Sequence, residues 1–373
     1  MWLADVRIAI FCNDFYPTIG GVQTAVRGIA AGLHARGHEV LVLTRQPSGS
    51  PESERVDAAD VRRFSWTLRP LQTFPLRWWR ERRRVAAVLD AWKPAVVYSH
   101  FVSTHALYAR RWSRKAGVPL ILSFRGNDAM SIAPRSLASR RAFARLTNDA
   151  AVILFSSGWL AEHMKGASWL RSRSGRLGVL ADAVDVSRAE PATSGERYLL
   201  AGGRFVQKKG FDLLLRAWSL IHGQINAPLW LAGDGPERAA LQELAANLQL
   251  SDRVRFLGPV PHERMLGLVA GSGLCVVPSR EEPYGIIVVE AQALGAPVVA
   301  CAVGNIPMLI EPGRTGFLSA PTPESLAATL IDAWHSDALQ KVARAGRESP
   351  AANRSYDTLA AELEDWIALA RAG

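Results

Sequence analysis

Short apolar runs alternate regularly with amphipathic stretches along this chain, and this alternation constrains its fold more than any other feature. Six runs in the first half predict buried strands: Val6 to Phe11, Glu39 to Thr44, Ala95 to Tyr98, Pro119 to Phe124, Ala151 to Phe155 and Arg176 to Leu180. Between the first two runs, apolar residues recur at helical spacing, at Val22, Val26, Ile29 and Leu33. Strands and helices that alternate in this way are typical of a parallel sheet.

The second half repeats this plan with six further strand-like runs: Tyr198 to Ala201, Leu229 to Ala232, Val254 to Leu257, Leu274 to Val277, Pro297 to Cys301 and Gly316 to Leu318. Residues 187–197 separate the two series and have the composition of a linker. A chain of 373 residues is also long enough for two domains. We therefore predict two doubly wound α/β domains, residues 1–187 and 188–354, followed by a C-terminal helix in residues 355–373.

The composition restricts the class of protein and its partners. Hydrophobic residues make up 49% of the chain, which predicts folded cores rather than disorder. Its three cysteines lie in apolar runs without the spacing of a disulfide framework or a zinc site, and no run of 18 apolar residues predicts a membrane span. These features predict a cytoplasmic protein. The net charge of +10 predicts anionic partners without choosing among them.

The most informative segment is PSREEPYGIIVVEAQALGAPVVA, residues 278–300, which begins directly after a predicted strand. If a helix begins near Gly285, its first amides, around Tyr284, Gly285 and Ile286, are placed to bind a phosphate. The carboxylates of Glu282 and Glu290 bracket this turn and suit hydrogen bonds from sugar hydroxyls. The β-branched residues at 286–289 also fit a strand, and periodicity alone does not decide between strand and helix.

A second group of charges follows the first predicted strand of the second half. Arg204 and Lys209 are five residues apart in the segment GGRFVQKKG, residues 202–210, which leads into a predicted helix. A fixed guanidinium and ammonium can stabilise the negative charge of a departing diphosphate without a metal ion. No pattern of metal ligands accompanies them, so we expect metal-independent chemistry.

Glu282 and Glu290, separated by seven residues, resemble the EX7E signature of retaining glycosyltransferase family 4. The basic segment around Arg204 and Lys209 resembles that family's GRL-x-x-x-KG pattern. The resemblance implies the GT-B fold, in which two Rossmann-like domains face a central cleft and the tail crosses back to the first domain. It assigns the transferred sugar to Glu282, the ribose to Glu290, and the diphosphate to Arg204 and Lys209. The segments around Gly233 and Leu257 also agree with a nucleotide pocket, and in that family the segment of Leu257 approaches the base through its backbone.

The resemblance also places an acceptor side in the first domain. Gly20 and Gly21 follow the first predicted strand, as a glycine pair does in the family. His100, and Arg125 with Asp128, follow later strands and fall where the family lines its cleft. Many members have a histidine where this chain has Arg125, so His100 becomes the candidate catalytic imidazole. A purely structural histidine is the alternative.

Residues 62–92 combine arginines with tryptophans. Eight arginines and a single acid, Glu81, lie between Arg62 and Arg84, interleaved with Trp66, Phe74, Trp78 and Trp79. This combination suits a helix at an anionic membrane surface, and Val85, Val88, Leu89 and Trp92 extend an apolar face. The alternative is a helix packed into the core with solvated arginines. Binding of nucleic acid is disfavoured because no nucleic-acid module accompanies the charge.

The sequence thus predicts a retaining hexosyltransferase with no cofactor, which transfers sugar from a nucleotide diphosphate donor, UDP or GDP being favoured, to a lipid-linked or polysaccharide acceptor. We expect it to be peripheral on the inner face of the cell membrane. Two alternatives remain at this stage. One is a nucleotide-sugar epimerase on the same fold, and the other is a non-catalytic membrane-binding protein.

Overall fold

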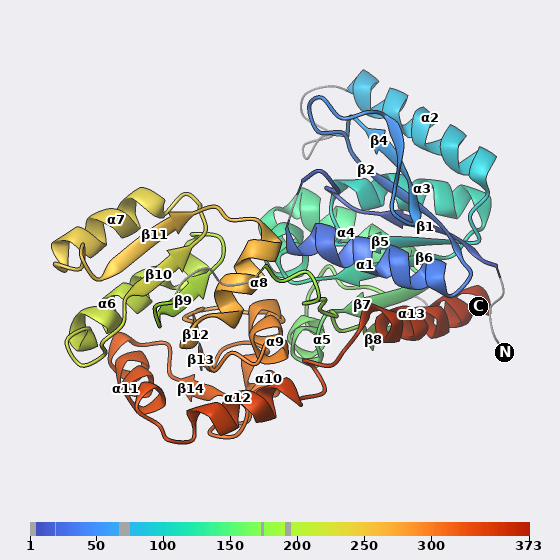
Figure 1. Cartoon of the computed structure of the whole chain (residues 1–373). Coiled ribbons are helices and arrows are strands. Elements are labelled where there is room, and N and C mark those ends of the chain that lie inside the picture. The colour runs from blue at the N-terminus through green and yellow to red at the C-terminus, as the bar shows by residue number, and fades with distance from the viewer. Residues whose placement is uncertain (1–4, 19, 67–74, 173–174, 191–194) are drawn as a thin grey trace. The chain divides into compact units, whose positions relative to one another are not determined.

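A computed structural model describes residues 5–18, 20–66, 75–172, 175–190 and 195–373, with residues 75–77 described for the backbone alone. The chain forms two compact units (Figure 1). Unit 1 comprises Met1–Ala183 and Ser355–Gly373, and unit 2 comprises Val184–Arg354. Residues 191–194, in the middle of the predicted linker, lie outside the described residues. No helix within the described ranges is long and apolar enough to cross a membrane.

Unit 1 is built on an eight-stranded sheet with the order β3-β4-β2-β1-β5-β6-β7-β8. All neighbouring strands are parallel except β3 and β4, which form an antiparallel pair. All six strands predicted for this half are present: β1 (Arg7–Phe11), β2 (Glu39–Arg45), β5 (Val96–His100), β6 (Leu120–Phe124), β7 (Val152–Phe155) and β8 (Leu177–Val179).

The sequence analysis missed β3 (Ser53–Val56) and β4 (Ala59–Phe64). Charged residues occupy both strands, so neither forms an apolar run, and β3 pairs on one side alone. The assignment of Arg62 to a basic helical stretch is therefore wrong. Arg62 and Arg63 lie in β4, and the helix that follows begins at Pro75.

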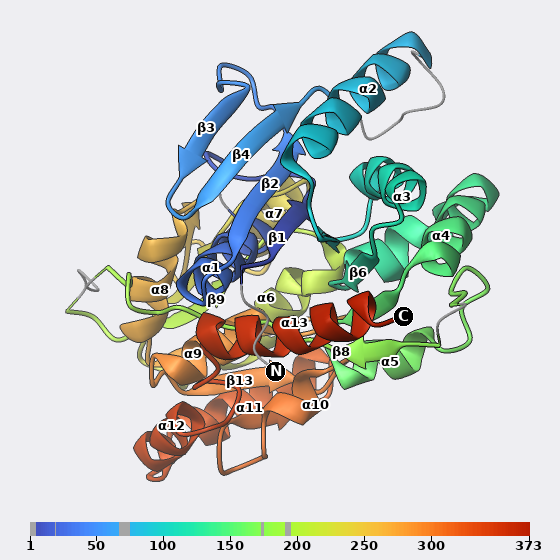
Figure 2. The same cartoon turned by 90° about the vertical axis from the view of Figure 1, so that its right-hand side faces the viewer.

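Helices cover both faces of this sheet. Ile8 and Ile10 of β1 pack against α1 and α13, whereas the alternate residues, Ala9 and Phe11, face a core shared with α2, α3, α4 and α5. The final helix α13 packs against α1 (Figure 2). The helices of this unit are α1 (Gly21–Ala35), α2 (Pro75–Trp92), α3 (Thr104–Ala116), α4 (Leu137–Asp149), α5 (Gly158–Met164) and α13 (Tyr356–Arg371).

Unit 2 has a six-stranded parallel sheet with the order β11-β10-β9-β12-β13-β14. The six strands predicted for this half are confirmed as β9 (Leu199–Gly202), β10 (Leu229–Ala232), β11 (Val254–Gly258), β12 (Leu274–Val277), β13 (Val298–Cys301) and β14 (Phe317–Ser319). The fold class predicted from the sequence, two parallel-sheet α/β domains, is therefore confirmed.

Two helical layers enclose the sheet of unit 2. Leu199 and Leu229 contribute to a core with α6, α7 and α11, while Tyr198 and Leu200 contribute to a core with α8, α9 and α10. The helices of this unit are α6 (Phe211–Ile221), α7 (Arg238–Asn247), α8 (His262–Ala270), α9 (Ile286–Ala293), α10 (Ile306–Leu309), α11 (Pro323–Trp334) and α12 (Leu339–Arg347).

Candidate active site

The charged residues singled out in the second half lie near the carboxyl ends of two neighbouring strands. Strand β9 pairs with β12 at the centre of the unit 2 sheet. Arg204 and Lys209 follow β9, and Glu282 follows β12. Loops at the carboxyl ends of parallel strands are where α/β proteins bind their ligands, because helix N-termini and loop residues converge there.

Lys209 and Glu282 meet in the structure. The Lys209 Nζ lies 2.5 Å from Glu282 Oε2, and the Ser279 hydroxyl donates to the same oxygen at 3.3 Å. The Glu282 side chain is 9% exposed and that of Lys209 27% exposed, so the pair is reachable from one side. An ammonium beside a carboxylate offers a donor toward an anion and an acceptor toward hydroxyls at a single point.

Glycine allows the two loops to approach this closely. Gly210, which ends the 3-10 turn Gln207–Lys209, has φ 67°, and a Cβ there would lie 2.0 Å from the carbonyl oxygen of Pro278. A side chain at this position is excluded both by the backbone conformation and by the neighbouring loop. Gly210 therefore sets the contact between the loop that carries Lys209 and the loop that carries Glu282.

A third loop supports Glu282 from its other side. The Glu282 carbonyl accepts a hydrogen bond from the Asn305 amide at 2.9 Å, and the Asn305 side chain donates to the carbonyl of Tyr284 at 3.0 Å. Gly304 has φ 58°, and a Cβ there would lie 2.1 Å from the Glu282 carbonyl oxygen. The backbone on both sides of the Glu282 carboxylate is thus fixed by main-chain contacts.

Residues 286–289 form the first turns of a helix and not a strand. Helix α9 begins after Gly285, whose φ of 101° favours glycine and which has no side chain to cap the first amides. The strand-like composition reflects burial, since Val288, Val289 and Ala291 are all enclosed. An uncapped helix N-terminus after a strand has the amide donors and partial positive charge that suit a phosphate.

Glu290 lies on the same helix as a buried carboxyl group. Burial raises its pKa to about 8. The Nε2 atom of His262, at the start of α8, lies 3.5 Å from Glu290 Oε1, and burial lowers the pKa of this imidazole. The sequence analysis missed His262. Its neighbour in space is 28 positions away in sequence, and only the packing of α8 on α9 brings the two together.

Three other predicted donor-side residues are placed without a direct contact to this pair. Arg204 is exposed in the loop after β9, and its guanidinium makes no hydrogen bond or ion pair within the described part of the chain. Gly233 has φ 144°, and a Cβ there would meet the carbonyl oxygen of Gly203 at 1.9 Å. Leu257 is half-buried at the end of β11.

The predicted acceptor-side glycines lie at the start of α1 in unit 1. Gly20 is the residue before the helix, with extended backbone, and Gly21 is its first residue. A Cβ at Gly20 would meet only the flexible side chain of Gln23, and a Cβ at Gly21 would meet nothing within 4 Å. Gly21 is therefore not required by packing inside this unit.

His100 and Arg125 belong to a buried polar cluster. The His100 Nδ1 lies 3.0 Å from the Tyr98 hydroxyl, and burial, followed by the charge of Arg125, lowers its pKa well below the usual value. The Arg125 guanidinium pairs with Asp182 at 3.0 Å and donates to the carbonyl of Leu180. This arrangement favours the structural alternative for His100, whose side chain is enclosed within its own unit.

Asp128 organises the loop that follows β6. Its carboxylate accepts main-chain hydrogen bonds from Val102, Arg125, Gly126 and Ala129, at 2.7 to 3.2 Å. The side chain is fully buried, and burial raises its pKa to about 6 despite these donors. Both Arg125 and Asp128 are thus engaged by their own unit.

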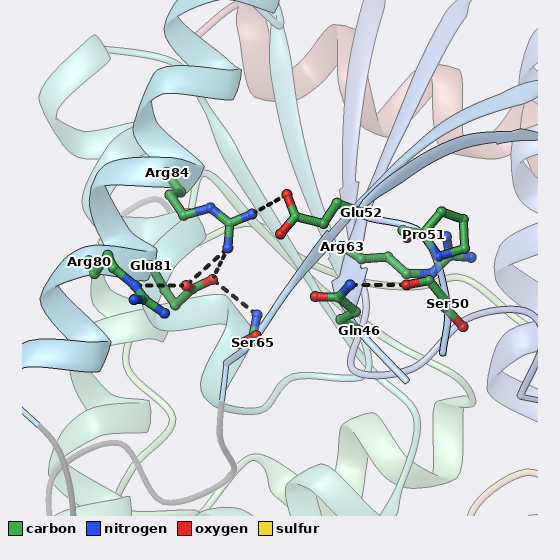
Figure 3. A network of polar contacts seen from close by, with 9 residues as sticks. All are labelled: Gln46, Ser50, Pro51, Glu52, Arg63, Ser65, Arg80, Glu81 and Arg84. Atoms are coloured by element: carbon green, nitrogen blue, oxygen red, sulfur yellow. Dashed lines mark hydrogen bonds and ion pairs between the residues drawn. The ribbon is translucent and has the colours of Figure 1, made fainter. Parts of the chain in front are cut away.

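Several described residues of the basic aromatic stretch make internal contacts. In Figure 3, the buried Glu81 accepts from the Ser65 amide and from Arg84, and Arg84 also pairs with Glu52 at 2.9 Å. Arg63 is buried in β4, where it pairs with Glu54 and donates to the Pro51 carbonyl.

The aromatic and apolar residues of this stretch are also mostly internal. Trp66 is buried and stacks on Phe64, while Val85 and Leu89 of α2 are fully enclosed. The predicted membrane contact through residues 62–92 therefore does not include Trp66, Val85 or Leu89. Phe74 lies outside the described residues. Charged and apolar groups that the sequence predicted to face a membrane instead pack between α2 and the sheet.

Comparisons with known proteins agree with this architecture. Residues 185–349 match the family described as "Glycosyl transferases group 1", and residues 20–173 match "Glycosyl transferase 4-like domain". The structure of HepE from Anabaena in complex with UDP-glucose is similar in fold, with a TM-score of 0.76 and 21% identity, covering 97% of this chain and 99% of HepE.

Two curated relatives extend the likeness in sequence. A GDP-mannose-dependent alpha-(1-6)-phosphatidylinositol monomannoside mannosyltransferase of Mycobacterium tuberculosis is 28% identical, covering 97% of this chain and 98% of its own. The lipopolysaccharide core biosynthesis glycosyltransferase LpsD of Rhizobium meliloti (strain 1021) is 30% identical over 292 residues, 76% of each chain. With this identity and the matching two-unit fold, the chain belongs to the GT-B glycosyltransferases.

Proposed function

We propose that this enzyme is a family 4 hexosyltransferase that transfers sugar from a nucleotide diphosphate donor with retention at the anomeric carbon. The observation that carries the proposal is the Lys209–Glu282 pair near the uncapped start of α9. Lys209, together with Arg204 and the amides of α9, would bind the diphosphate. Glu282 would accept hydrogen bonds from the sugar, and Glu290 from the ribose.

The chemical step needs no group beyond these residues and the two substrates. The bond between the anomeric carbon and the diphosphate oxygen breaks while the acceptor oxygen bonds to that carbon from the same face. The acceptor proton passes to the departing phosphate oxygen. Lys209 and Arg204 stabilise the charge that develops on the diphosphate, which is where fixed cations contribute most. We propose that catalysis proceeds without a metal ion.

Donor preference is tested first by binding. UDP-, GDP- and ADP-sugars are compared by thermal shift, since a ligand that binds only the folded state raises the melting temperature. HepE was solved with UDP-glucose, and the mycobacterial relative is named for GDP-mannose, so both bases are tested. A shift with one donor that Lys209→Ala reduces supports the proposal. No shift with any donor contradicts it.

Transfer is then measured with the donor that binds, in the presence and absence of EDTA. Nuclear magnetic resonance of the product reports the anomeric configuration. Equal rates with and without EDTA, and retained configuration, are expected. An inverted product rejects the proposed mechanism. Conversion of donor sugar without acceptor identifies an epimerase instead.

We further propose a lipid-linked or polysaccharide acceptor, with contact to an anionic membrane through the exposed part of α2. LpsD is named for lipopolysaccharide core biosynthesis, which supports a glycolipid acceptor. Trp79 is 42% exposed, the Arg83 guanidinium lies 3.4 Å from its ring centre, and the Arg80 side chain is 71% exposed. A tryptophan beside arginines suits the headgroup level of a membrane.

Sedimentation with vesicles of phosphatidylglycerol and phosphatidylcholine tests this contact. Replacing Arg80 and Arg83 with glutamate should weaken binding, because each basic residue near the surface contributes about 1 kcal/mol. Arg55→Glu is the matched control, since Arg55 is also exposed but lies on β3. Equal sedimentation of the wild-type and doubly substituted proteins would reject a membrane role for α2.

A further inference from the structure

A second ion pair joins the same two loops that carry Lys209 and Glu282. The Arg280 guanidinium donates from Nη1 and Nη2 to the two carboxylate oxygens of Asp212, each at 2.7 Å. Pairing through both nitrogens fixes the orientation of the two groups, which a single contact does not. The pair connects the loop after β12 with the first turn of α6.

Arg280 holds the opposite segment at more than one point. Its Nη1 also donates to the carbonyl of Gln207 at 3.0 Å, and its main-chain amide donates to the carbonyl of Lys208 at 2.8 Å. Gln207 and Asp212 lie on either side of Lys209 along the chain. One arginine therefore holds the 3-10 turn and the first helical turn that flank the Lys209 side chain.

Arg280 also stands two residues before Glu282 in its own loop. The Arg280 side chain thus adds to the main-chain contacts that set the position of the Glu282 carboxylate relative to the Lys209 ammonium. The Arg280 hydrogen bond lowers the pKa of Asp212 and keeps this partner ionised. Both side chains are about one-third exposed, 37% and 32%, so the pair contributes little to stability through burial.

We propose that Arg280 is a positioning residue, whose two-point contact with Asp212 holds Lys209 beside Glu282 at the junction of diphosphate and sugar in the donor. The inference rests on the proposed function, because it concerns the same site. It assigns Arg280 no contact with the substrates. Its effect on the reaction passes entirely through the placement of Lys209 and Glu282.

The first test compares kinetic constants of Arg280→Ala and Asp212→Ala with the wild type. Displacing a catalytic group by about 1 Å can lower a rate by about 100-fold, so kcat should fall by about 10- to 100-fold. The donor KM should change less than kcat, because the charge near Lys209 is greatest in the transition state. Melting temperatures should stay close to that of the wild type.

The matched control is Arg314→Ala, in the same unit. Arg314 pairs with Glu311 at 2.5 Å, and their side chains are 72% and 64% exposed. This pair lies outside the loops of the candidate active site, so its loss should leave kcat unchanged. If Arg280→Ala lowers only the melting temperature and the active fraction, with normal kcat per active molecule, the pair is merely structural and the proposal is wrong.

A double-mutant cycle tests whether Arg280 acts through Lys209. In a Lys209→Ala background, the further change Arg280→Ala should lower kcat by less than about threefold, because residues that act as a unit are not additive. Independent, additive losses would overturn the proposal.

Failure of the proposed function is distinguishable from failure of this inference. A wild-type protein that transfers sugar from none of the donors rejects the function itself. A wild-type protein that transfers sugar, while Arg280→Ala matches Arg314→Ala in kcat, rejects the positioning role alone.

Discussion

The loops after the strands of the two sheets both carry charged side chains, but these are used in opposite ways. In unit 2, the Lys209–Glu282 pair remains partly open, and Arg204 is exposed without an ion-pair partner in the described residues. In unit 1, Asp128 is buried, the Arg125 side chain is 5% exposed, and both are held by hydrogen bonds from their own unit. The partly open charges of unit 2 can exchange their present partners for a ligand.

This difference separates residues that we propose to act on substrates from residues that shape the loops around them. A buried charge is stable only when its partners satisfy it, and removing one partner leaves a costly unpaired group. Substitution in unit 1 should therefore affect folding first. Substitution of the open pair in unit 2 should affect transfer first.

The largest expected effect is on transfer by Glu282→Gln. The amide keeps the size of the side chain but loses the negative charge that Lys209 faces and one acceptor for sugar hydroxyls. We expect kcat to fall by about 100-fold or more, as for loss of a positioned transition-state contact. The melting temperature should change little. Turnover near the wild-type rate in a folded variant would show that Glu282 takes no part in the mechanism. The proposed contrast between the open charges of unit 2 and the buried charges of unit 1 would then fail.

For Asp128→Asn in unit 1 we expect the opposite pattern, a loss of stability with little change in transfer. The amide nitrogen cannot accept the main-chain hydrogen bonds that the carboxylate now receives. Leaving a buried amide donor unsatisfied costs about 1–3 kcal/mol, so urea denaturation should show a loss of about that size. Transfer per folded molecule should change little. Unchanged stability with lost transfer would instead place Asp128 in an acceptor site, as the family resemblance implies.

Glu290 is intermediate between the open charges of unit 2 and the buried charges of unit 1, because it is buried yet is proposed to contact substrate. Its pKa of about 8 lies above the ordinary 4.5, so between these values the folded protein holds a proton that the unfolded chain has lost. Rising pH therefore lowers the free energy of unfolding, by roughly 1.4 kcal/mol per pH unit at most. Glu290→Gln, which does not titrate, should flatten this decline.

The measurement is best made between about pH 7 and 8, as the difference in slope between the wild type and Glu290→Gln. The pKa of Asp128 is raised only to about 6, and burial lowers the pKa values of His100, His105 and His262, so most of their contributions end as the unfolded imidazoles lose their protons near pH 6.5. Thermal unfolding of both proteins across the window gives the slopes. Parallel curves would show that Glu290 is already ionised in the folded protein.

Much of the fold could be predicted because its strands are buried on both faces and appear as apolar runs. Strands β3 and β4 could not, since their charges are satisfied across the pair, as by Arg63 and Glu54, and no apolar run marks them. Arg63 was assigned to a membrane-facing stretch for the same reason, because its partner Glu54 is not evident from the sequence. A sequence shows charge, but not the partner that neutralises it.

The candidate site was predictable only where residue type and spacing carry the chemistry. The segments of Lys209 and Glu282 follow strands that are adjacent in the sheet, so their meeting depends on strand order as much as on motif. The helix at Ile286 was ambiguous because burial on all sides removes helical periodicity. His262 and the Arg280–Asp212 pair depend on packing between distant segments, which no local pattern marks.

The smallest effect is expected for Lys208→Ala, the neighbour of the proposed phosphate-binding lysine. The Lys208 Nζ lies 3.8 Å from Glu281 Oε1, and both side chains are about one-third exposed, at 33% and 37%. Exposed pairs contribute about 0–1 kcal/mol, so kcat/KM should change by less than about threefold. Lys209→Ala, with the same loss of charge one residue away, should cost far more. If the two variants lose transfer equally, the general positive charge of this loop binds the donor, and the fixed Lys209–Glu282 geometry does not.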